Sequence, residues 1–295
     1  MDTSRTKDLL ADFVLFLAAL IWGTTFALVK ASLSYTTPFM FMTMRFTLAL
    51  IIMTAVVSPH IKALSRRELT GGILTGGSIF LGFTFQTWGL VYTTASKSAF
   101  ITGLNVVLVP FLLWGLIHQR IRAKRWIAAG LATVGLYLLT NPQSGAGINR
   151  GDLLTLACAV AFAVQIILLG IYAPTIHTLR YFWVQLITVT LLSALATLAV
   201  AGWEVTPSGT LWLGLGITGV LGTAGAFLGM TWAQRRTTPT RTALILTSEP
   251  VFGALFAVTI AGEFLSLIAW IGSALIVAVI IWSELGNQNP QAARA

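Results

Sequence analysis

The stretch TTPTRTALILTSEPVFGALFAVTIAGE, residues 237–263, decides how the rest of this chain is interpreted. It is almost wholly apolar, yet it contains a carboxylate, Glu249, followed directly by Pro250. Glu249 comes eight residues after Arg241, or ~12 Å along a helix that rises about 1.5 Å per residue. That depth is close to the middle of a hydrocarbon layer ~30 Å thick.

A carboxylate at that depth has two interpretations. An acid in hydrocarbon is costly, so it usually faces a cavity and marks a pathway for a substrate or ion. Pro250 has no N–H for the carbonyl of Leu246, which leaves a backbone acceptor beside the acid. The alternative is a protonated, hydrogen-bonded glutamate that only holds helices together.

The same pattern occurs twice in the chain. A shift of 144 residues matches apolar, aromatic and polar positions over three hydrophobic segments, and a shift of 140 residues aligns two earlier segments. Constant offsets of this kind predict two copies of one five-span unit, residues 1–145 and 146–295. The matched residues include Lys97 with Arg241, Asn105 with Glu249, Trp88 with Trp232, Phe83 with Phe227, Trp22 with Phe162 and Arg45 with Gln185.

The composition is typical of a membrane protein. Of 295 residues, 56% are hydrophobic and 9% are charged, against roughly 25% charged residues in soluble domains. The net charge of +9 comes from short basic clusters between apolar runs, which indicates membrane topology and not nucleic-acid binding. Cys158 is the only cysteine, which excludes an internal disulfide and a multi-cysteine metal site.

The apolar runs predict an all-α polytopic membrane protein with ten transmembrane helices in two inverted five-helix repeats. The first run lacks a convincing cleavage site, so we expect it to remain as the first span. The predicted spans are 12–33, 38–58, 70–92, 95–117, 124–141, 151–173, 180–201, 210–234, 240–262 and 265–284.

Lysines and arginines orient these spans. With a cytoplasmic amino terminus, fourteen of the 18 Lys and Arg residues fall on the cytoplasmic side, Arg45 lies within a span, and Lys30, Lys97 and Arg150 fall outside. The positive-inside rule therefore predicts a multi-pass protein of the cell membrane with both termini cytoplasmic. Because five spans per copy is an odd number, the two copies enter the membrane in opposite directions, as in many secondary transporters.

Several motifs resemble a known family. They are AALIWGTTFALVK (18–30), MRFTLAL (44–50), GLVYTTASKSAFITGLNVVLVPF (89–111), SEPVFGALFAVTIAGE (248–263) and WIGSALIVAVII (270–281). Together they resemble the drug/metabolite transporter superfamily, specifically its ten-span members with two EamA-type repeats. The resemblance implies alternating-access transport, most often export of amino acids, related metabolites or toxic compounds. One departure is that the pair Gly262 and Glu263 is replaced by His118 and Gln119 in the first repeat.

Polar and aromatic side chains inside the spans are the candidates for a transport site. The repeat-related Glu249 and Asn105 should lie near the pseudo-twofold axis, in a midplane cavity of amides and aromatic rings. Each amide has interhelical hydrogen bonding as an alternative role, and each aromatic has packing or lipid contact. The candidate substrate-binding or coupling residues are Glu249, Asn105, Gln86, Arg45, Gln165, Trp22, Trp88 and Trp232, with Phe26 and Phe83 as further aromatic walls and Pro250 and Pro110 as helix breaks.

Arg45 allows more than one role. A buried arginine seldom stands alone, and either Glu249 or a substrate carboxylate could neutralise it. It lies nearer the outer surface than the midplane, so its side chain could also reach the interface.

These features predict a secondary active transporter, since the chain has no P-loop signature. Its expected partners are a small-molecule substrate, the lipid bilayer and protons as coupling ion, with no cofactor and no nucleic acid. The predicted activity is export of amino acids or related small metabolites, and the alternative is broad efflux of lipophilic or cationic compounds. A membrane enzyme is the rival class, but Glu249 has no partner acid or histidine at matching depth.

The predicted orientation can be tested with single cysteines. Cys158 is replaced, and new cysteines are placed one at a time at Ser144 and Ser65. The positive-inside rule places Ser144 outside the cell and Ser65 inside. An impermeant thiol reagent added to intact cells should therefore label a cysteine at position 144 and not one at position 65. The reverse labelling pattern would refute the orientation.

Overall fold

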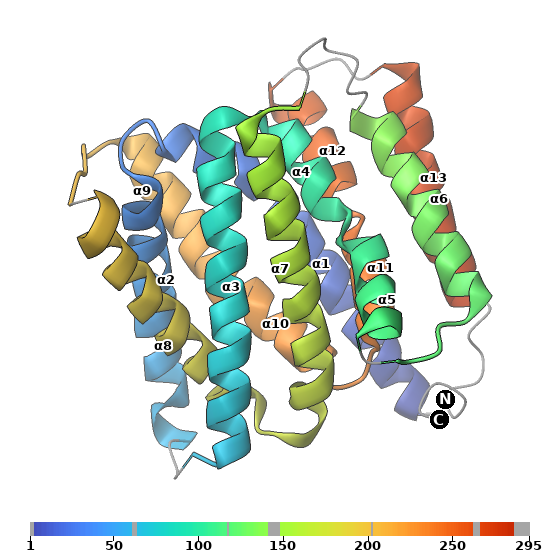
Figure 1. Ribbon diagram of the computed structural model, residues 1–295, viewed down its shortest axis with the longest axis horizontal. Helices are drawn as coiled ribbons and strands as arrows, with labels where there is room; N and C mark the ends of the chain where they lie inside the picture. Colours follow the sequence, from blue (N-terminus) through green and yellow to red (C-terminus); the bar gives the residue numbers. More distant parts are fainter. Residues whose placement is uncertain are drawn as a thin grey trace.

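The computed structural model describes residues 3–60, 64–116, 118–140, 148–201, 203–261 and 266–285. Almost all of these residues are helical, which confirms the predicted all-helical fold. The helices run up and down through one bundle (Figure 1). Within the described residues they form ten passes, three of which contain two α-helices each.

The first repeat contributes five passes. Side chains of Thr37, Ser65 and Thr94 cap the helices that follow them, and Ser65 forms a capping box with Glu68. The fourth pass is divided into α4 and α5. The helices are α1 (Thr3–Ser32), α2 (Pro38–Val57), α3 (Arg66–Tyr92), α4 (Ala95–Gly103), α5 (Asn105–Gly115) and α6 (Ala123–Thr140).

The second repeat also contributes five passes. Its third pass contains a π-helical segment, Ile217–Gly225, between α9 and α10, where the sequence predicted an uninterrupted helix over 210–234. Its fourth pass is divided into α11 and α12. The helices are α7 (Arg150–Tyr172), α8 (Thr178–Ala196), α9 (Gly209–Gly216), α10 (Ala226–Ala233), α11 (Pro239–Leu246), α12 (Glu249–Ala261) and α13 (Leu267–Leu285).

Six helical stretches among the described residues are long and apolar enough to cross a membrane. The central helix α3 is not among them, because its many glycine, threonine and other polar residues lower its hydropathy. The shorter stretch Leu267–Trp282 is also apolar. The six stretches are Asp8–Ser32, Pro38–Val57, Lys97–Gly115, Arg150–Thr175, Thr178–Val200 and Gly209–Ala233.

The fourth passes of both repeats are broken at equivalent positions. The sequence predicted breaks in the spans 95–117 and 240–262 at Pro110 and Pro250, and in the structure α4 ends before Leu104 and α11 ends before Thr247. In the second repeat the Ser248 hydroxyl donates to the Ile245 carbonyl at 2.7 Å, and the Thr247 hydroxyl donates to the Leu244 carbonyl. These side-chain bonds take up carbonyls at the end of α11 and close the helix.

The two prolines behave differently from each other. Pro250 is the second residue of α12, where a missing N–H costs little because that position has no helical acceptor. Pro110 was expected to break its helix, but it lies inside α5, and the break comes earlier, at Leu104. The residue before this break is Gly103, a poor helix former that ends α4.

The repeats are inverted and exchange contacts. Figure 1 shows that the pass made by α4 and α5 and the pass made by α11 and α12 run in opposite directions. Helix α1 packs against α11 and α12 of the second repeat, while α7 packs against α4 and α5 of the first. The broken passes also contact each other, α5 against α11 and α4 against α12. The start of α1 and the end of α13 lie at the same end of the bundle (Figure 1).

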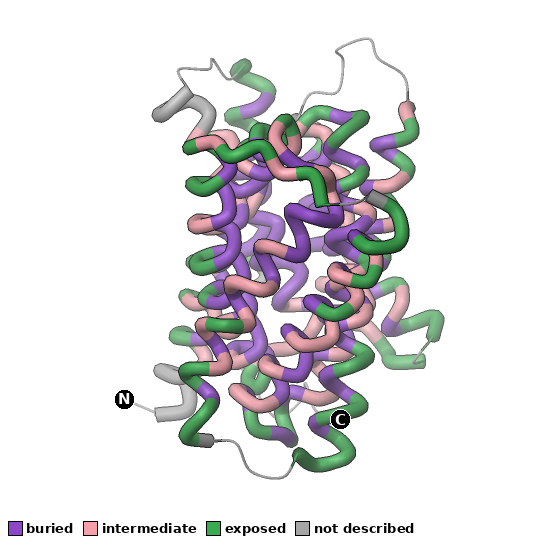
Figure 2. The backbone as a smooth tube through the Cα atoms, turned by 90° about the vertical axis from the view of Figure 1, so that its left-hand side faces the viewer, coloured by how far each residue is buried: buried purple, intermediate pink, exposed green. Residues whose placement is uncertain are grey.

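Buried residues concentrate along the middle of the bundle, and exposed ones lie on its outer faces and ends (Figure 2). The largest fully buried side chains include Tyr181, Phe41, Phe46 and Phe182. Large apolar side chains also cover the outer surface, where a lipid environment would accept them. Examples are Phe13, Ile51, Leu81, Leu195, Leu221 and Ile271.

Two ion pairs at opposite ends of the bundle are related by the repeat. Arg241 at the start of α11 pairs with Asp12 of α1, and Lys97 in α4 pairs with Asp152 of α7 at 3.4 Å. Arg241 corresponds to Lys97 by the shift of 144 residues, and Asp152 corresponds to Asp12 by the shift of 140. Lys97, which the charge count placed on the outer side, therefore joins the two repeats.

The aspartates of the two ion pairs differ in how many further hydrogen bonds they accept. Asp152 also accepts hydrogen bonds from the Thr93 hydroxyl at 2.6 Å and from the backbone N–H of Asn149 at 3.1 Å. Asp12 Oδ1 has no hydrogen-bond partner among the described residues. The junction around Asp152 thus fixes the ends of three helices, whereas the pair at Asp12 joins two.

We therefore expect Asp152→Ala to destabilise the protein more than Asp12→Ala. The difference should be roughly 1–3 kcal/mol, because Asp152 loses additional hydrogen bonds made by a charged group. The measurement is the apparent melting temperature of each purified variant in detergent at one scan rate. Equal losses of stability would show that the additional contacts of Asp152 contribute nothing.

Candidate functional site

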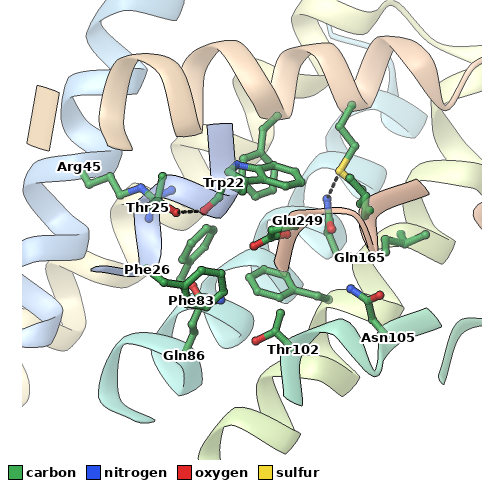
Figure 3. Close-up of a pocket in the computed structure, with 15 residues that line it drawn as sticks. Trp22, Thr25, Phe26, Arg45, Phe83, Gln86, Thr102, Asn105, Gln165 and Glu249 are labelled. Carbon is green, nitrogen blue, oxygen red and sulfur yellow. Dashed lines mark hydrogen bonds between the residues drawn. The ribbon is translucent and has the colours of Figure 1, made fainter. Parts of the chain in front are cut away.

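The two helix breaks place Asn105 and Glu249 at the same cavity. Each is the first residue of the second half-helix of its pass, α5 or α12. The space measures about 480 Å³, including the part that is open to the outside. The lining residues are Trp22, Thr25, Phe26, Arg45, Phe83, Gln86, Thr102, Asn105, Phe162, Gln165, Ile166, Phe227, Met230, Leu246 and Glu249 (Figure 3).

Both repeats build this cavity in equivalent ways. Every lining residue except Arg45 has a repeat-related mate that also lines the cavity. The cavity therefore has approximate twofold symmetry in position, while its chemistry differs between the halves. The shift of 140 residues relates Trp22 to Phe162, Thr25 to Gln165 and Phe26 to Ile166, and the shift of 144 relates Phe83 to Phe227, Gln86 to Met230, Thr102 to Leu246 and Asn105 to Glu249.

Glu249 lies in the middle of the cavity in Figure 3. Its carboxyl group has no ion pair or hydrogen bond with any other residue that the structure describes. The amino end of α12 on which it sits carries a partial positive charge that favours an anionic group. An acid held by no neighbouring side chain can bind a cationic group of a ligand or a proton.

Arg45 reaches the cavity from α2. The residue is only 2% exposed, so its side chain does not extend to the membrane interface. Its Nε donates a hydrogen bond to the Thr223 hydroxyl at 2.7 Å, and its guanidinium lies 4.4 Å from the centre of the Phe83 ring. Arg45 and Glu249 form no salt bridge in the described structure, so Glu249 does not neutralise it.

Three amide side chains line the same space. Gln86 and Asn105 are each 8% exposed, and Asn105 Oδ1 has no hydrogen-bond partner among the described residues. Gln165 Nε2 has only a long contact, 3.8 Å, to the sulfur of Met230. Because these amides make few hydrogen bonds within the protein, they can form hydrogen bonds with a bound molecule.

Aromatic rings form the walls. The Trp22 and Phe227 ring centres lie 4.8 Å apart, and Phe83 contacts Phe162 at 5.2 Å and Phe227 at 5.7 Å. The indole N–H of Trp22 donates to the carbonyl of Gly222 at 2.7 Å, in the π-helical segment. That bond orients the ring and gives one carbonyl of the irregular helix a partner.

Two expected wall residues lie elsewhere. Trp88 is 40% exposed and packs edge-on against Phe39, and Trp232 lies beside the guanidinium of Arg236 at 5.7 Å. They are repeat mates, and neither lines the cavity. Their depth was estimated from the sequence, but the direction in which a side chain points around its helix depends on packing that the sequence did not reveal.

Sequence reasoning also missed seven of the fifteen lining residues. The missed residues are Thr25, Thr102, Phe162, Ile166, Phe227, Met230 and Leu246. The repeat itself carried the signal for five of them, because the mates of the predicted Trp22, Phe26, Phe83, Gln86 and Gln165 are cavity residues. The mate of Arg45, Gln185, is fully buried, does not line the cavity and has no partner for its amide among the described residues.

Comparison with known proteins identifies the architecture. The family model described as the EamA-like transporter family matches this chain twice, at residues 9–141 and 149–284. The chain belongs to the EamA-like transporter family. It is a multi-pass membrane transporter with two EamA repeats, and it is therefore not an enzyme.

Relatives of this EamA-family protein carry the same general description. A protein of Archaeoglobus fulgidus named as an uncharacterized transporter is 36% identical over 93% of this chain and 86% of its own length. The uncharacterized inner membrane transporter YedA of Escherichia coli K12 is 22% identical, over 96% of this chain and 94% of its own. A solved crystal structure superimposes with a TM-score of 0.77 at 21% identity, covering 97% of this chain and 99% of that one, and shows the same fold.

Glu249 is held against α1 by a contact that only glycine permits. A Cβ atom at Gly23 would lie 2.7 Å from the backbone oxygen of Glu249 and 2.8 Å from the backbone nitrogen of Gly253. Any side chain at position 23 must therefore displace the amino end of α12.

We expect Gly23→Ala to reduce transport strongly and to destabilise the protein by about 1–3 kcal/mol, as overpacking does in well-packed interiors. Gly130→Ala is the matched control, because nothing lies within 4 Å of a Cβ added there. Uptake into proteoliposomes and the melting temperature in detergent are compared for the two variants. Normal transport by Gly23→Ala would show that the position of Glu249 tolerates this displacement.

Proposed function

We propose that this EamA-family protein is a secondary active transporter that exports amino acids or related small zwitterionic metabolites. The observation that supports this most is a midplane cavity with one unpaired carboxyl group, Glu249, at the start of a broken helix. Around it, amides offer hydrogen bonds and aromatic rings offer apolar contact. A small molecule with a polar head and an apolar side chain matches that combination.

Alternating access in this proposal uses the broken passes. Both breaks lie at the cavity, between the halves of α4–α5 and of α11–α12, where irregular backbone is tolerated because it is enclosed by protein. Inverted repeats of this kind carry a fixed midplane site that opens to either side as one set of helices tilts against the other. The outer and inner halves of each broken pass are the segments that move.

Glu249 couples transport to an ion gradient in this proposal. Its carboxylate binds either the amino group of a substrate or a proton, and one group excludes the other. A proton that enters from outside therefore displaces the substrate outward, which gives exchange of protons for substrate. The alternative, broad efflux of lipophilic cations, is favoured by the carboxylate and aromatic walls and opposed by the positive charge of Arg45 in the same cavity.

Glu249→Gln is the decisive variant, since it keeps size and hydrogen bonding and removes the titration. We expect it to insert and purify normally, to lose at least ~90% of gradient-driven transport, and to retain exchange of substrate for substrate better than net flux. The measurement is counterflow and proton-driven flux of the L-amino acids in proteoliposomes over a range of pH. Glu204→Gln, an exposed residue, is the matched control.

Undiminished transport by Glu249→Gln at every pH would show that Glu249 serves helix packing and not transport. If the variant fails to fold, a cysteine at Asn105 in a Cys158→Ala background provides the test, because substrate in the cavity should protect it from thiol reagents. Flux of quaternary cations without counterflow of any amino acid would support the alternative function.

A further inference from the structure

Arg45 breaks the symmetry of the cavity. The other lining residues come in repeat-related pairs, whereas the mate of Arg45, Gln185, is fully buried outside the cavity. The two residues in the lining that carry a full charge are Arg45 and Glu249, and both have a neutral amide, Gln185 or Asn105, at the equivalent position. The positions of the lining residues thus have approximate twofold symmetry, but the two charged groups do not, so the two halves of the cavity differ in charge.

The Arg45 guanidinium lies at the cavity with most of its N–H donors unused by the described residues. Among the described residues, only its Nε has a hydrogen-bond partner, the hydroxyl of Thr223. Thr223 in turn donates to the Thr218 carbonyl at 2.8 Å, a bond across the π-helical segment. The Phe83 ring covers one face of the group at 4.4 Å. In Figure 3 Arg45 enters from one side of the cavity, and Glu249 lies in the middle.

A buried guanidinium with no carboxylate partner needs an anion. Its planar group presents parallel N–H donors that match a carboxylate in a bidentate pair, and such pairs are strongest where water is excluded. The described structure supplies no acid within ion-pair distance of Arg45. The anion must therefore come with whatever occupies the cavity.

We propose that Arg45 is the anion subsite of the cavity and binds the carboxylate of the transported molecule. This inference rests on the proposed transport function. A substrate held by its carboxylate at Arg45 points its amino group toward Glu249, so the two charges select one of the two orientations that a twofold cavity offers. The subsite selects zwitterionic substrates and rejects amines that lack a carboxylate.

The test compares three probes for each L-amino acid that shows counterflow in the unchanged protein. They are the amino acid itself, its carboxamide and its decarboxylated amine, each used as a competitor in proteoliposomes. We expect the amino acid to compete at least ~10-fold better than either analogue, because only it offers a carboxylate to Arg45. Equal competition by all three in the unchanged protein would overturn the proposal without any variant.

Arg45→Gln then places at position 45 the amide that the second repeat carries. We expect it to reduce the discrimination between amino acid and carboxamide to within about twofold, while Arg45→Lys keeps part of it. Arg66→Gln, which removes an exposed arginine, should leave the discrimination unchanged. Discrimination retained by Arg45→Gln would assign the carboxylate to another residue.

The failures of the two proposals are distinguishable. Counterflow of amino acids without discrimination against the carboxamides refutes the anion subsite and leaves the transport proposal intact. Absence of counterflow by every amino acid, with flux of lipophilic amines, refutes the proposed substrate class and the subsite together. If Arg45→Gln does not fold, the comparison of the three probes on the unchanged protein still tests whether the cavity recognises a carboxylate.

Discussion

A helix that breaks within a hydrocarbon layer exposes backbone groups that lipid cannot satisfy, and this constraint organises the protein. The breaks before Asn105 and before Glu249 are tolerated because they face each other inside the bundle, with α1 and α7 packed against them. Side chains of Thr247 and Ser248 take up carbonyls on one side of the second break. The remaining helices enclose these two interruptions, and the cavity lies between them.

The exchange of contacts between repeats follows from the same constraint. Each broken pass is supported by the first helix of the other repeat, and each of these junctions carries a repeat-related ion pair near its end. Close backbone approach at Gly23 fixes the start of α12, so Glu249 is positioned by the first repeat although it belongs to the second. Each repeat therefore needs the other to position its own part of the site.

Much of this architecture could be predicted from the sequence, because the repeat shift and the depth of Glu249 depend only on spacing. Spacing identified Asn105 as the partner position of Glu249, and both line the cavity. It did not show which way a side chain points around its helix, so Trp88 and Trp232 were included and Phe162 and Phe227 were missed. The break at Leu104 was predicted too late in the chain, at Pro110, because no proline lies beside Leu104 as Pro250 lies beside the second break.

The differences between repeat mates carry the functional information. In alternating access through inverted repeats, the states open to either side are related by the pseudo-twofold axis, so packing shared by both repeats contributes nearly equally to each. Only positions where the mates differ in chemistry can favour one state or one substrate orientation. At the ends, the Asp152 junction has bonds that the Asp12 pair lacks. In the cavity, the mate of Glu249 is an amide, Asn105, and Arg45 has no lining mate. In the proposed mechanism, direction and specificity are therefore determined at such unequal positions.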